Sequence, residues 1–216
     1  MRIAVLGGTG PEGLGLAARL AQIGESVVIG SRSAERAAEA VAKLREKLPQ
    51  ASLAGAGNLA AATDAEAAVL AFPYEGVDAT LAECGAALAG KLVIDTIVPM
   101  KVDGKFFGVE PPAEGSAGER IQARVPTAKV VSAFKHQSAH HLIDLDHKME
   151  GDVLICGSDD AAKAIVAGLV TRIRDLRPID VGDLRNARVF EAMTALLLNI
   201  NRKHKTRSSV AILGVK

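Results

Sequence analysis

Short apolar runs alternate with longer amphipathic segments along most of this 216-residue chain. A continuous apolar run such as Arg2–Leu6 is typical of a strand that is buried on both faces of a parallel sheet. The next segment places Leu16, Leu20 and Ile23 on one helix face and ends at Gly24. The pattern predicts strands over 2–6, 26–30, 51–54, 67–72, 91–95, 129–134, 152–156 and 177–181, and helices over 13–24, 34–48, 58–65, 77–88, 117–124, 159–173 and 187–201. This order predicts an α/β fold, a Rossmann-type doubly wound and mostly parallel sheet with a small C-terminal helical part.

Two later segments complete the predicted organisation. Residues 101–115 contain three glycines and the pair Pro111-Pro112, which predicts a long loop. We expect a Rossmann domain over 1–140 and a smaller C-terminal α/β part over 141–216, with a long amphipathic helix over 185–203. The apolar stripe of that helix is formed by Val189, Met193, Leu196, Leu197 and Ile200. An apolar stripe on a terminal helix favours at least a dimer.

Composition and charge narrow the class of protein. Apolar residues make up 49% and charged residues 24% of the chain, which is typical of a globular protein. The net charge of +1 creates no global field that would attract nucleic acid or an anionic membrane. No run approaches the roughly 18–20 apolar residues that span a bilayer, and the apolar N-terminal run is too short for a signal peptide. Cys84 and Cys156 fit no metal or redox spacing, so we expect two buried reduced thiols and a cytoplasmic protein.

A glycine turn follows the first predicted strand, where Gly8, Gly10 and Gly13 have the G-x-G-x-x-G spacing. In a strand–turn–helix context this spacing is typical of a dinucleotide site. We expect Gly8 to allow the tight turn, Gly10 to let the backbone approach the pyrophosphate, and Gly13 to let the helix pack close to the sheet. The phosphates would then face unpaired N–H groups at the helix N-terminus, with the Thr9 hydroxyl as a further donor.

The end of the second predicted strand indicates which dinucleotide binds. An NAD site usually has Asp or Glu there, to accept hydrogen bonds from the ribose 2′-hydroxyl. Here the sequence is Gly30-Ser31-Arg32-Ser33, with Arg36 one helical turn further on. Ser31 can donate to phosphate oxygens, Arg32 can stack on adenine and pair with phosphate, and Arg36 adds a second positive charge. The sequence therefore favours NADP(H) over NAD(H).

Two dipeptides, Phe72-Pro73 and Val98-Pro99, fall at the carboxyl ends of predicted strands. Ligands of open parallel sheets bind in the crevice outside those ends. Proline has a fixed φ and no N–H, so it can present a rigid apolar wall to a flat nicotinamide ring. Simple strand termination explains each proline equally well.

No general acid–base group stands out, so we predict no catalytic side chain. His136 and His140 would share a helix face if their segment were helical, but no acidic residue joins them at a metal-ligand spacing. Ser138 is better placed to cap a helix that starts after it. We expect no metal here, but an anion- or cofactor-binding loop, or solvated histidines. Hydride transfer between two cofactors needs no protein proton donor, only parallel rings in close contact.

Several blocks along nearly the whole chain resemble the NADPH-dependent reductases of coenzyme F-420 (F420). The blocks are residues 1–13 with Gly30-Ser31-Arg32, then Phe72-Pro73, Val98-Pro99, and residues 130–134, 153–160 and 176–182. The resemblance implies hydride transfer between NADP(H) and the deazaflavin coenzyme F-420, by a homodimer whose C-terminal helix lies close to the partner. It also implies that the deazaflavin lies over the nicotinamide, near Val98, Pro99, residues 135–139 and the stretch around Leu213.

The expected site residues follow from the glycine turn, the second strand and this resemblance. The cofactor-binding candidates are Gly8, Thr9, Gly10, Pro11, Glu12, Gly13, Ser31, Arg32, Arg36, Phe72, Pro73, Val98, Pro99 and Ala139. The deazaflavin-binding candidates are Lys135, His136, Gln137 and Leu213.

One segment departs from the family pattern. Lys135-His136-Gln137 stands where the family has an imidazole and an apolar residue, at positions 135 and 137. Lys135 could pair with the polyanionic tail of the coenzyme, or the change could indicate a different acceptor. Two alternatives therefore stand beside F420 reduction. One is an NADPH-dependent reductase of a flavin, a pterin or a metal complex. The other is a non-catalytic NADP(H)-sensing module, which the basic tail over 202–207 could support.

Overall fold

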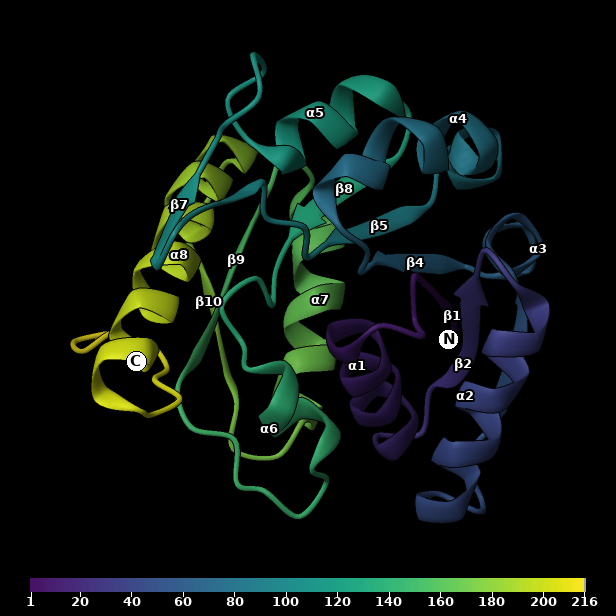
Figure 1. The fold of residues 1–216 in the computed structure, drawn as a ribbon. Coiled ribbons are helices and arrows are strands. Elements are labelled where there is room, and N and C mark those ends of the chain that lie inside the picture. Colours follow the sequence, from purple (N-terminus) through teal and green to yellow (C-terminus); the bar gives the residue numbers. More distant parts are fainter. Residues whose placement is uncertain (216) are drawn as a thin grey trace.

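The computed structural model describes residues 1–215 and contains an eight-stranded sheet with helices on both faces (Figure 1). The strands of this sheet are β1 (Arg2–Leu6), β2 (Ser26–Ser31), β3 (Leu53–Gly57), β4 (Ala67–Leu70), β5 (Leu92–Asp95), β8 (Lys129–Ser132), β9 (Asp152–Gly157) and β10 (Arg177–Asp180). A separate hairpin consists of β6 (Met100–Asp103) and β7 (Phe106–Val109). The helices are α1 (Pro11–Gln22), α2 (Ala34–Lys47), α3 (Asn58–Asp64), α4 (Val77–Leu88), α5 (Ala117–Arg124), α6 (Ala139–Ile143), α7 (Asp160–Arg172) and α8 (Ala187–His204), with 3-10 turns at Tyr74–Gly76 and Leu184–Asn186.

The strands pair in the order β10-β9-β8-β5-β4-β1-β2-β3. All pairs from β8 to β3 are parallel; β9 is antiparallel to β8, and β10 is parallel to β9. Val5 in the middle of the sheet lies between Ile29 of β2 and Val69 of β4, and all three side chains are buried. The predicted fold class, a mostly parallel Rossmann-type sheet, is confirmed.

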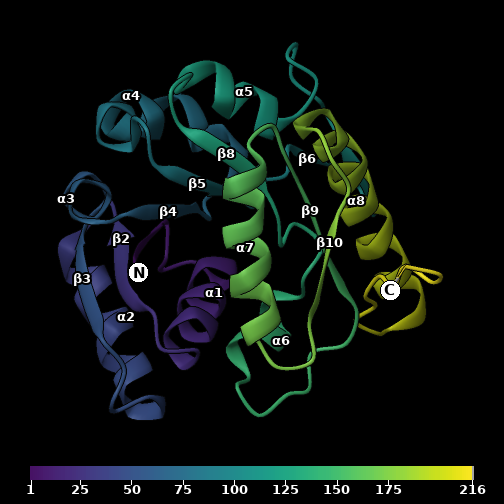
Figure 2. The ribbon, with the colours of Figure 1, turned by 180° about the vertical axis from the view of Figure 1, so that it is seen from behind.

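Two hydrophobic cores lie on the two faces of the sheet. One core packs α1, α2, α6 and α7 against the sheet, and the other packs α3, α4, α5 and α8 against it. Figure 2 shows α7 crossing the face that α1 also covers. Because helices cover both faces, the short central strands consist almost entirely of buried apolar residues. Strands β9 and β10 extend the same sheet past β8, so residues on both sides of position 140 build it.

Side chains cap the N-termini of three of the predicted helices. Ser33 Oγ accepts from Arg36 N at 3.3 Å and Ser116 Oγ accepts from Glu119 N at 3.0 Å. A carboxylate oxygen of Asp159 accepts from Ala162 N at 2.7 Å. Ser138 does precede α6, but its side chain accepts no hydrogen bond there. These caps satisfy N–H groups that the first helical turn leaves free.

Several predicted boundaries are wrong by a few residues. Helix α1 begins at Pro11 rather than at residue 13, because proline fits the first helical position. Strand β3 lies over Leu53–Gly57, later than the predicted 51–54. Helix α8 continues to His204 and stops where Lys205 takes a left-handed conformation with φ of 51°.

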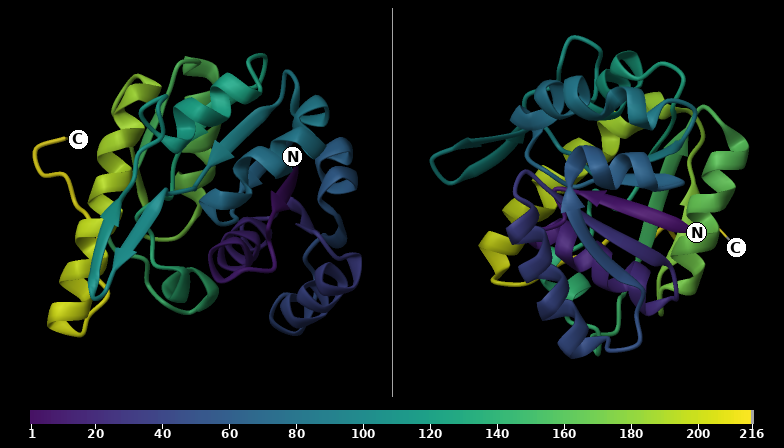
Figure 3. Two further views of the ribbon diagram at one scale, coloured as in Figure 1. Left: turned by 45° about the horizontal axis from the view of Figure 1, so that its top comes forward. Right: turned by 90° about the vertical axis from the view of Figure 1, so that its right-hand side faces the viewer.

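The predicted long loop over residues 101–115 is wrong, because residues 100–109 form the β6–β7 hairpin. Gly104, with φ of +54°, supplies the turn, a hairpin signal that the nearby glycines and prolines obscured. Asn199 of α8 holds the hairpin through Phe107, whose N–H donates to Asn199 Oδ1 at 3.0 Å and whose carbonyl accepts from Asn199 Nδ2 at 2.7 Å. Figure 3 shows the hairpin beside α8 in one view and projecting from the body in the other.

The two cysteines are buried and free, as predicted. Burial raises the pKa of Cys84 to about 11 and that of Cys156 to about 12, so both stay as thiols at neutral pH. Within residues 1–215, no helix combines the length and the apolar character that crossing a membrane requires.

Candidate functional site

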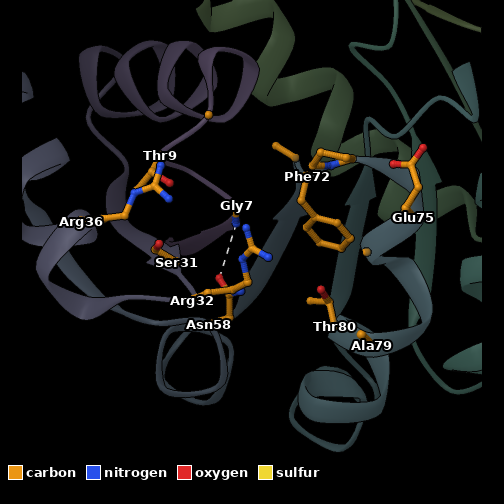
Figure 4. Close-up of a pocket in the computed structure, with 14 residues that line it drawn as sticks. Gly7, Thr9, Ser31, Arg32, Arg36, Asn58, Phe72, Glu75, Ala79 and Thr80 are labelled. Carbon is orange, nitrogen blue, oxygen red and sulfur yellow. Dashed lines mark hydrogen bonds between the residues drawn. The ribbon is translucent and has the colours of Figure 1, made fainter. Parts of the chain in front are cut away.

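A cavity of about 510 Å³, the first cavity, opens at the carboxyl ends of β1, β2 and β4 (Figure 4). It is lined by Gly7, Thr9, Gly10, Ser31, Arg32, Arg36, Asn58, Ala71, Phe72, Pro73, Glu75, Gly76, Ala79 and Thr80. Figure 4 shows Thr9, Arg32 and Arg36 on one side and Phe72, Glu75 and Thr80 on the other. This is the position at which open α/β sheets bind ligands.

The glycines of the turn have different tasks in this geometry. A Cβ at Gly10 would meet only Gly7 O, at 3.5 Å, so this backbone is open toward the cavity. A Cβ at Gly13 would lie 2.8 Å from both Gly7 O and Gly8 Cα, so Gly13 permits close helix–sheet packing. A Cβ at Gly8 would lie 2.7 Å from Val5 O. The contacts at Gly8 and Gly13 agree with the tight turn and the close helix packing expected of them, whereas the approach of Gly10 to a pyrophosphate stays a prediction.

Gly7 is a further requirement of the turn that sequence reasoning missed. It has φ of +76°, and a Cβ there would lie 2.7 Å from Ala71 O. Its N–H donates to Asn58 Oδ1 at 3.4 Å, so α3 supports the turn from the side. The contact between Asn58 and the turn had one signal in the sequence. Asn58 comes directly after the third strand, and the carboxyl ends of parallel strands meet at this edge of the sheet.

Two cations without a carboxylate partner lie at one end of the first cavity. Arg32 and Arg36 are exposed, and among the ion pairs of residues 1–215 neither guanidinium takes part. By contrast, Arg120 and Arg124 of α5 share Asp78. Ser31 Oγ accepts from Ser33 N at 3.3 Å and keeps its own hydrogen to donate. This set of donors fits a phosphate on an adenosine ribose.

A second cavity, of about 330 Å³, adjoins the first and shares Gly10, Ala71, Phe72 and Pro73 with it. Its remaining lining residues are Pro11, Glu12, Tyr74, Thr96, Ile97, Val98 and Lys135. Of the two dipeptides predicted to wall the nicotinamide, Phe72-Pro73 and Val98-Pro99, only part lies at this cavity. Pro73 and Val98 line the second cavity, whereas Pro99 is buried and lines none of the three cavities of the site.

A third cavity, of about 310 Å³, lies between α1, the segment after β8, and α8. It shares Glu12 and Lys135 with the second cavity. Its other lining residues are His136, Gln137, Ser138, Ala139, His140, Thr194, Leu197, Leu198, Asn201 and Ser208. The three cavities therefore form one row along the sheet edge. Leu213, another predicted site residue, is 91% exposed and lines none of them.

The ammonium of Lys135 points into the protein and not toward a ligand. Its side chain is fully buried, and Nζ donates to Asp95 Oδ2 at 2.6 Å, to Glu191 Oε1 at 3.1 Å and to the Ile97 carbonyl. These three acceptors use all three of its hydrogens. The suggestion that Lys135 pairs with a polyanionic tail therefore does not fit the structure; the long-range partners Asp95 and Glu191, which no local spacing indicates, take its charge.

Lys135, Asp95 and Glu191 form a buried triad in which burial and charge shift the pKa values of Lys135 and Glu191. Burial would lower the pKa of Lys135, but the carboxylates of Asp95 and Glu191 outweigh burial and hold it above its usual value. Burial raises the pKa of Glu191 to about 7, with Lys135 opposing the rise and Asp95 adding to it. Asp95 is further satisfied by Ser132 Oγ at 2.6 Å and Ile97 N at 2.9 Å. Asp95 and Lys135 thus form a fully bonded ion pair beneath the site.

His136 and Gln137 are also turned inward. His136 Nε2 and Gln137 Nε2 lie 2.8 and 3.0 Å from the Asp152 carbonyl at the start of β9. Burial lowers the pKa of His136, so the ring is neutral at pH 7. The Asp152 carboxylate pairs with Arg177 and accepts from Ile212 N at 2.6 Å. The segment that differs from the family pattern thus anchors β9 and the C-terminal stretch.

Arg19 of α1 holds the loop after α6, a contact that sequence reasoning missed. Its guanidinium is buried and donates to the carbonyls of His141, Leu142, Asp144, Leu145 and His147. The close approach of α6 also needs Gly15, where a Cβ would lie 2.6 Å from Leu142 Cβ. His141 and His147 stack at 3.9 Å, but residues 1–215 contain no group of three His, Cys, Asp or Glu side chains that could hold a metal ion.

Comparison with known proteins places this geometry in a family. The model of a family described as "NADP oxidoreductase coenzyme F420-dependent" matches residues 2–99. The F420-dependent NADP reductase of Methanocaldococcus jannaschii is 38% identical over 97% of this chain and 96% of its own. That of Methanothermobacter marburgensis is 40% identical, with the same coverage of 97% and 96%. A solved structure from Arthrobacter sp. FB24, assigned as an F420-dependent NADP reductase, is 30% identical with a TM-score of 0.83 and covers 99% of both chains.

Proposed function

The chain belongs to the family of F420-dependent NADP reductases, and on this premise we propose that it is an oxidoreductase that transfers hydride between NADP(H) and coenzyme F420. The observation that most supports this is the row of three adjoining cavities, which begins at two cations without a carboxylate partner. Such a row suits one phosphorylated dinucleotide and a second flat ligand placed end to end.

The first cavity takes the adenosine half of NADP(H). Arg32, Arg36 and Ser31 bind the 2′-phosphate, and the open backbone at Gly10 faces the pyrophosphate with Thr9 as a donor. The N-terminus of α1, which no side chain caps, contributes its free N–H groups and the positive end of the helix dipole.

The second and third cavities take the two reacting rings. Phe72, Pro73 and Val98 give the nicotinamide apolar walls that exclude water. The deazaflavin enters from the third cavity, whose walls come from residues 136–140 and from α8. Hydride passes between nicotinamide C4 and deazaflavin C5 when the rings lie in contact, so the task of the protein is chiefly to position them.

The decisive experiment mixes the purified protein with NADPH and oxidised F420 and follows the loss of deazaflavin absorbance. Turnover with F420, much faster with NADPH than with NADH, is the expected result. Turnover with FMN or FAD but not with F420 would assign another acceptor. Tight NADPH binding without turnover of any acceptor would favour the sensing module.

We also propose that the protein is a cytoplasmic homodimer that uses the outer face of α8. The predicted stripe divides in the structure: Leu197 is buried, whereas Val189 and Leu196 are 56% and 58% exposed. The hairpin that packs against α8 carries two further exposed apolar side chains, Val102 and Phe106. Light scattering after gel filtration should give twice the mass of the 216-residue chain, and Leu196→Glu should shift it to the monomer. A monomeric wild-type protein would contradict this assembly.

A further inference from the structure

Glu12 occupies the wall between the second and third cavities. It is the second residue of α1, and it and Lys135 are the two residues that line both cavities. On the proposed function, its carboxyl group therefore lies where the two reacting rings meet.

This carboxyl group has an unused oxygen. Glu12 Oε1 is buried and has no hydrogen-bond partner among residues 1–215. A buried polar atom without a partner is costly, and such atoms in a native site call for a ligand or a chemical role.

No charged neighbour neutralises Glu12. The Lys135 ammonium is directed to Asp95, Glu191 and the Ile97 carbonyl. His136 is neutral on the Asp152 carbonyl, and the other titratable side chains of the two cavities are Tyr74 and His140. Burial accordingly raises the pKa of Glu12 to about 8.

The reaction releases or consumes one proton along with the hydride. Oxidation of reduced F420 breaks the C5–H bond, whose hydrogen and electron pair form the new C4–H bond of NADPH, and the ring N–H proton must also leave. In the opposite direction the same ring nitrogen gains a proton. A carboxyl group whose pKa lies near the working pH is suited to hold that proton in both directions.

We propose that Glu12 is a catalytic residue that accepts this proton when reduced F420 is oxidised and returns it when F420 is reduced. In one direction its carboxylate takes the proton, and the resulting acid later loses it to water; in the other direction the acid donates. This inference rests on the proposed function. It adds an acid–base group to a site for which the sequence predicted none.

The test measures kcat/KM between pH 5.5 and 9.5 in both directions for the wild-type protein and for Glu12→Gln, which keeps the shape but cannot carry the proton. In the wild type, NADP+ reduction should rise with pH through the pKa of Glu12, because the carboxylate is the active form. F420 reduction should fall over the same range, because the acid is the active form. In Glu12→Gln, the rise of kcat/KM for NADP+ reduction and its fall for F420 reduction, the two pH limbs, should both disappear. The kcat/KM should drop in both directions by roughly 10²-fold.

Two controls separate this role from others. His140→Gln removes a further titratable side chain of the third cavity and should keep both limbs. Glu46→Gln changes an exposed glutamate of α2, remote from the cavities, and should behave like the wild type. Thermal melting and the Kd for NADPH of Glu12→Gln should match the wild type.

The outcomes are distinct. Glu12→Gln that retains both limbs would overturn the role of Glu12 while leaving the proposed function intact, since the wild type still turns over F420. A loss of activity that arises entirely from weaker NADPH binding would also overturn it. A wild-type protein that does not turn over F420 would reject the proposed function and the proton role with it.

Discussion

The two ends of the cavity row are built in opposite ways. At the end near β1 and β2, the site consists of open backbone, one glycine turn and the guanidinium groups of Arg32 and Arg36, which no carboxylate of residues 1–215 pairs. At the end near α6 and α8, by contrast, Lys135, His136 and Gln137 hydrogen-bond to acceptors inside the protein. Charges kept without an internal partner are available to a ligand, whereas charges paired in the interior specify the fold. We therefore expect substitutions at the first end to change binding before stability, and substitutions at the second end to do the reverse.

The largest expected effect is at Lys135. Lys135→Met would leave the buried carboxylates of Asp95 and Glu191 without their cation, which should cost about 3–5 kcal/mol in the free energy of unfolding. Urea denaturation measures this loss. The control is Lys129→Met, which removes a half-exposed partner of Asp159 and should cost at most about 1 kcal/mol. Equal losses in the two variants would show that the buried triad does not stabilise this end of the site.

Arg19→Leu should have the next largest effect. It leaves five buried or half-buried carbonyls of the loop after α6 without their donor, at a cost of roughly 2–3 kcal/mol. Hydrogen exchange measured by mass spectrometry should accelerate over residues 141–147. Arg45→Leu, which removes a donor to the single carbonyl of Leu53, is the matched control and should leave that loop protected.

Arg32→Ala tests the opposite end. Losing a charge-assisted contact to the 2′-phosphate should weaken NADPH binding by about 1.5–3 kcal/mol, or roughly 10–100-fold. NADH binding and the melting temperature should change little, because Arg32 has no carboxylate partner in the described chain. Fluorescence titration with both nucleotides measures this, with Lys43→Ala on the exposed side of α2 as the control. Equal weakening of NADPH and NADH would refute the 2′-phosphate assignment.

A pair of glycine substitutions sharpens the comparison within one turn. Gly13→Ala should destabilise the protein by about 1–3 kcal/mol, because its Cβ meets backbone atoms at 2.8 Å. Gly10→Ala should stay within about 0.5 kcal/mol of the wild-type stability, since Gly10 has an ordinary φ of −77° and open space. The methyl group added by Gly10→Ala would instead obstruct the pyrophosphate and weaken NADPH binding. Thermal melts and nucleotide titrations of both variants check this division; a Gly10→Ala protein that binds NADPH normally would contradict it.

Features that depend on residues close together in the chain were predictable, whereas features that depend on distant segments were not. The caps at Ser33 and Ser116 and the close packing at Gly8 and Gly13 were predictable, because each depends on residues a few positions apart. The β6–β7 hairpin was missed because the glycines and prolines around it indicated a loop, and because its hydrogen bonds to α8 come from Asn199, about 90 residues further along the chain. Pro99 was placed in the site because it follows a predicted strand end and by the family resemblance, whereas packing buries it away from the three cavities.

The sequence by itself determined the order of the strands of the eight-stranded sheet and of the helices between them, the dinucleotide turn and the preference for a phosphorylated cofactor. These features follow from backbone geometry and from side chains that act close to their own place in the chain. Only the tertiary structure decided the direction in which Lys135, His136 and Gln137 face, and that Glu12 lies with a bare carboxyl oxygen between two cavities. The physical reason is that desolvation and pairing depend on which distant segments pack around a charge, and no spacing within the sequence records that packing.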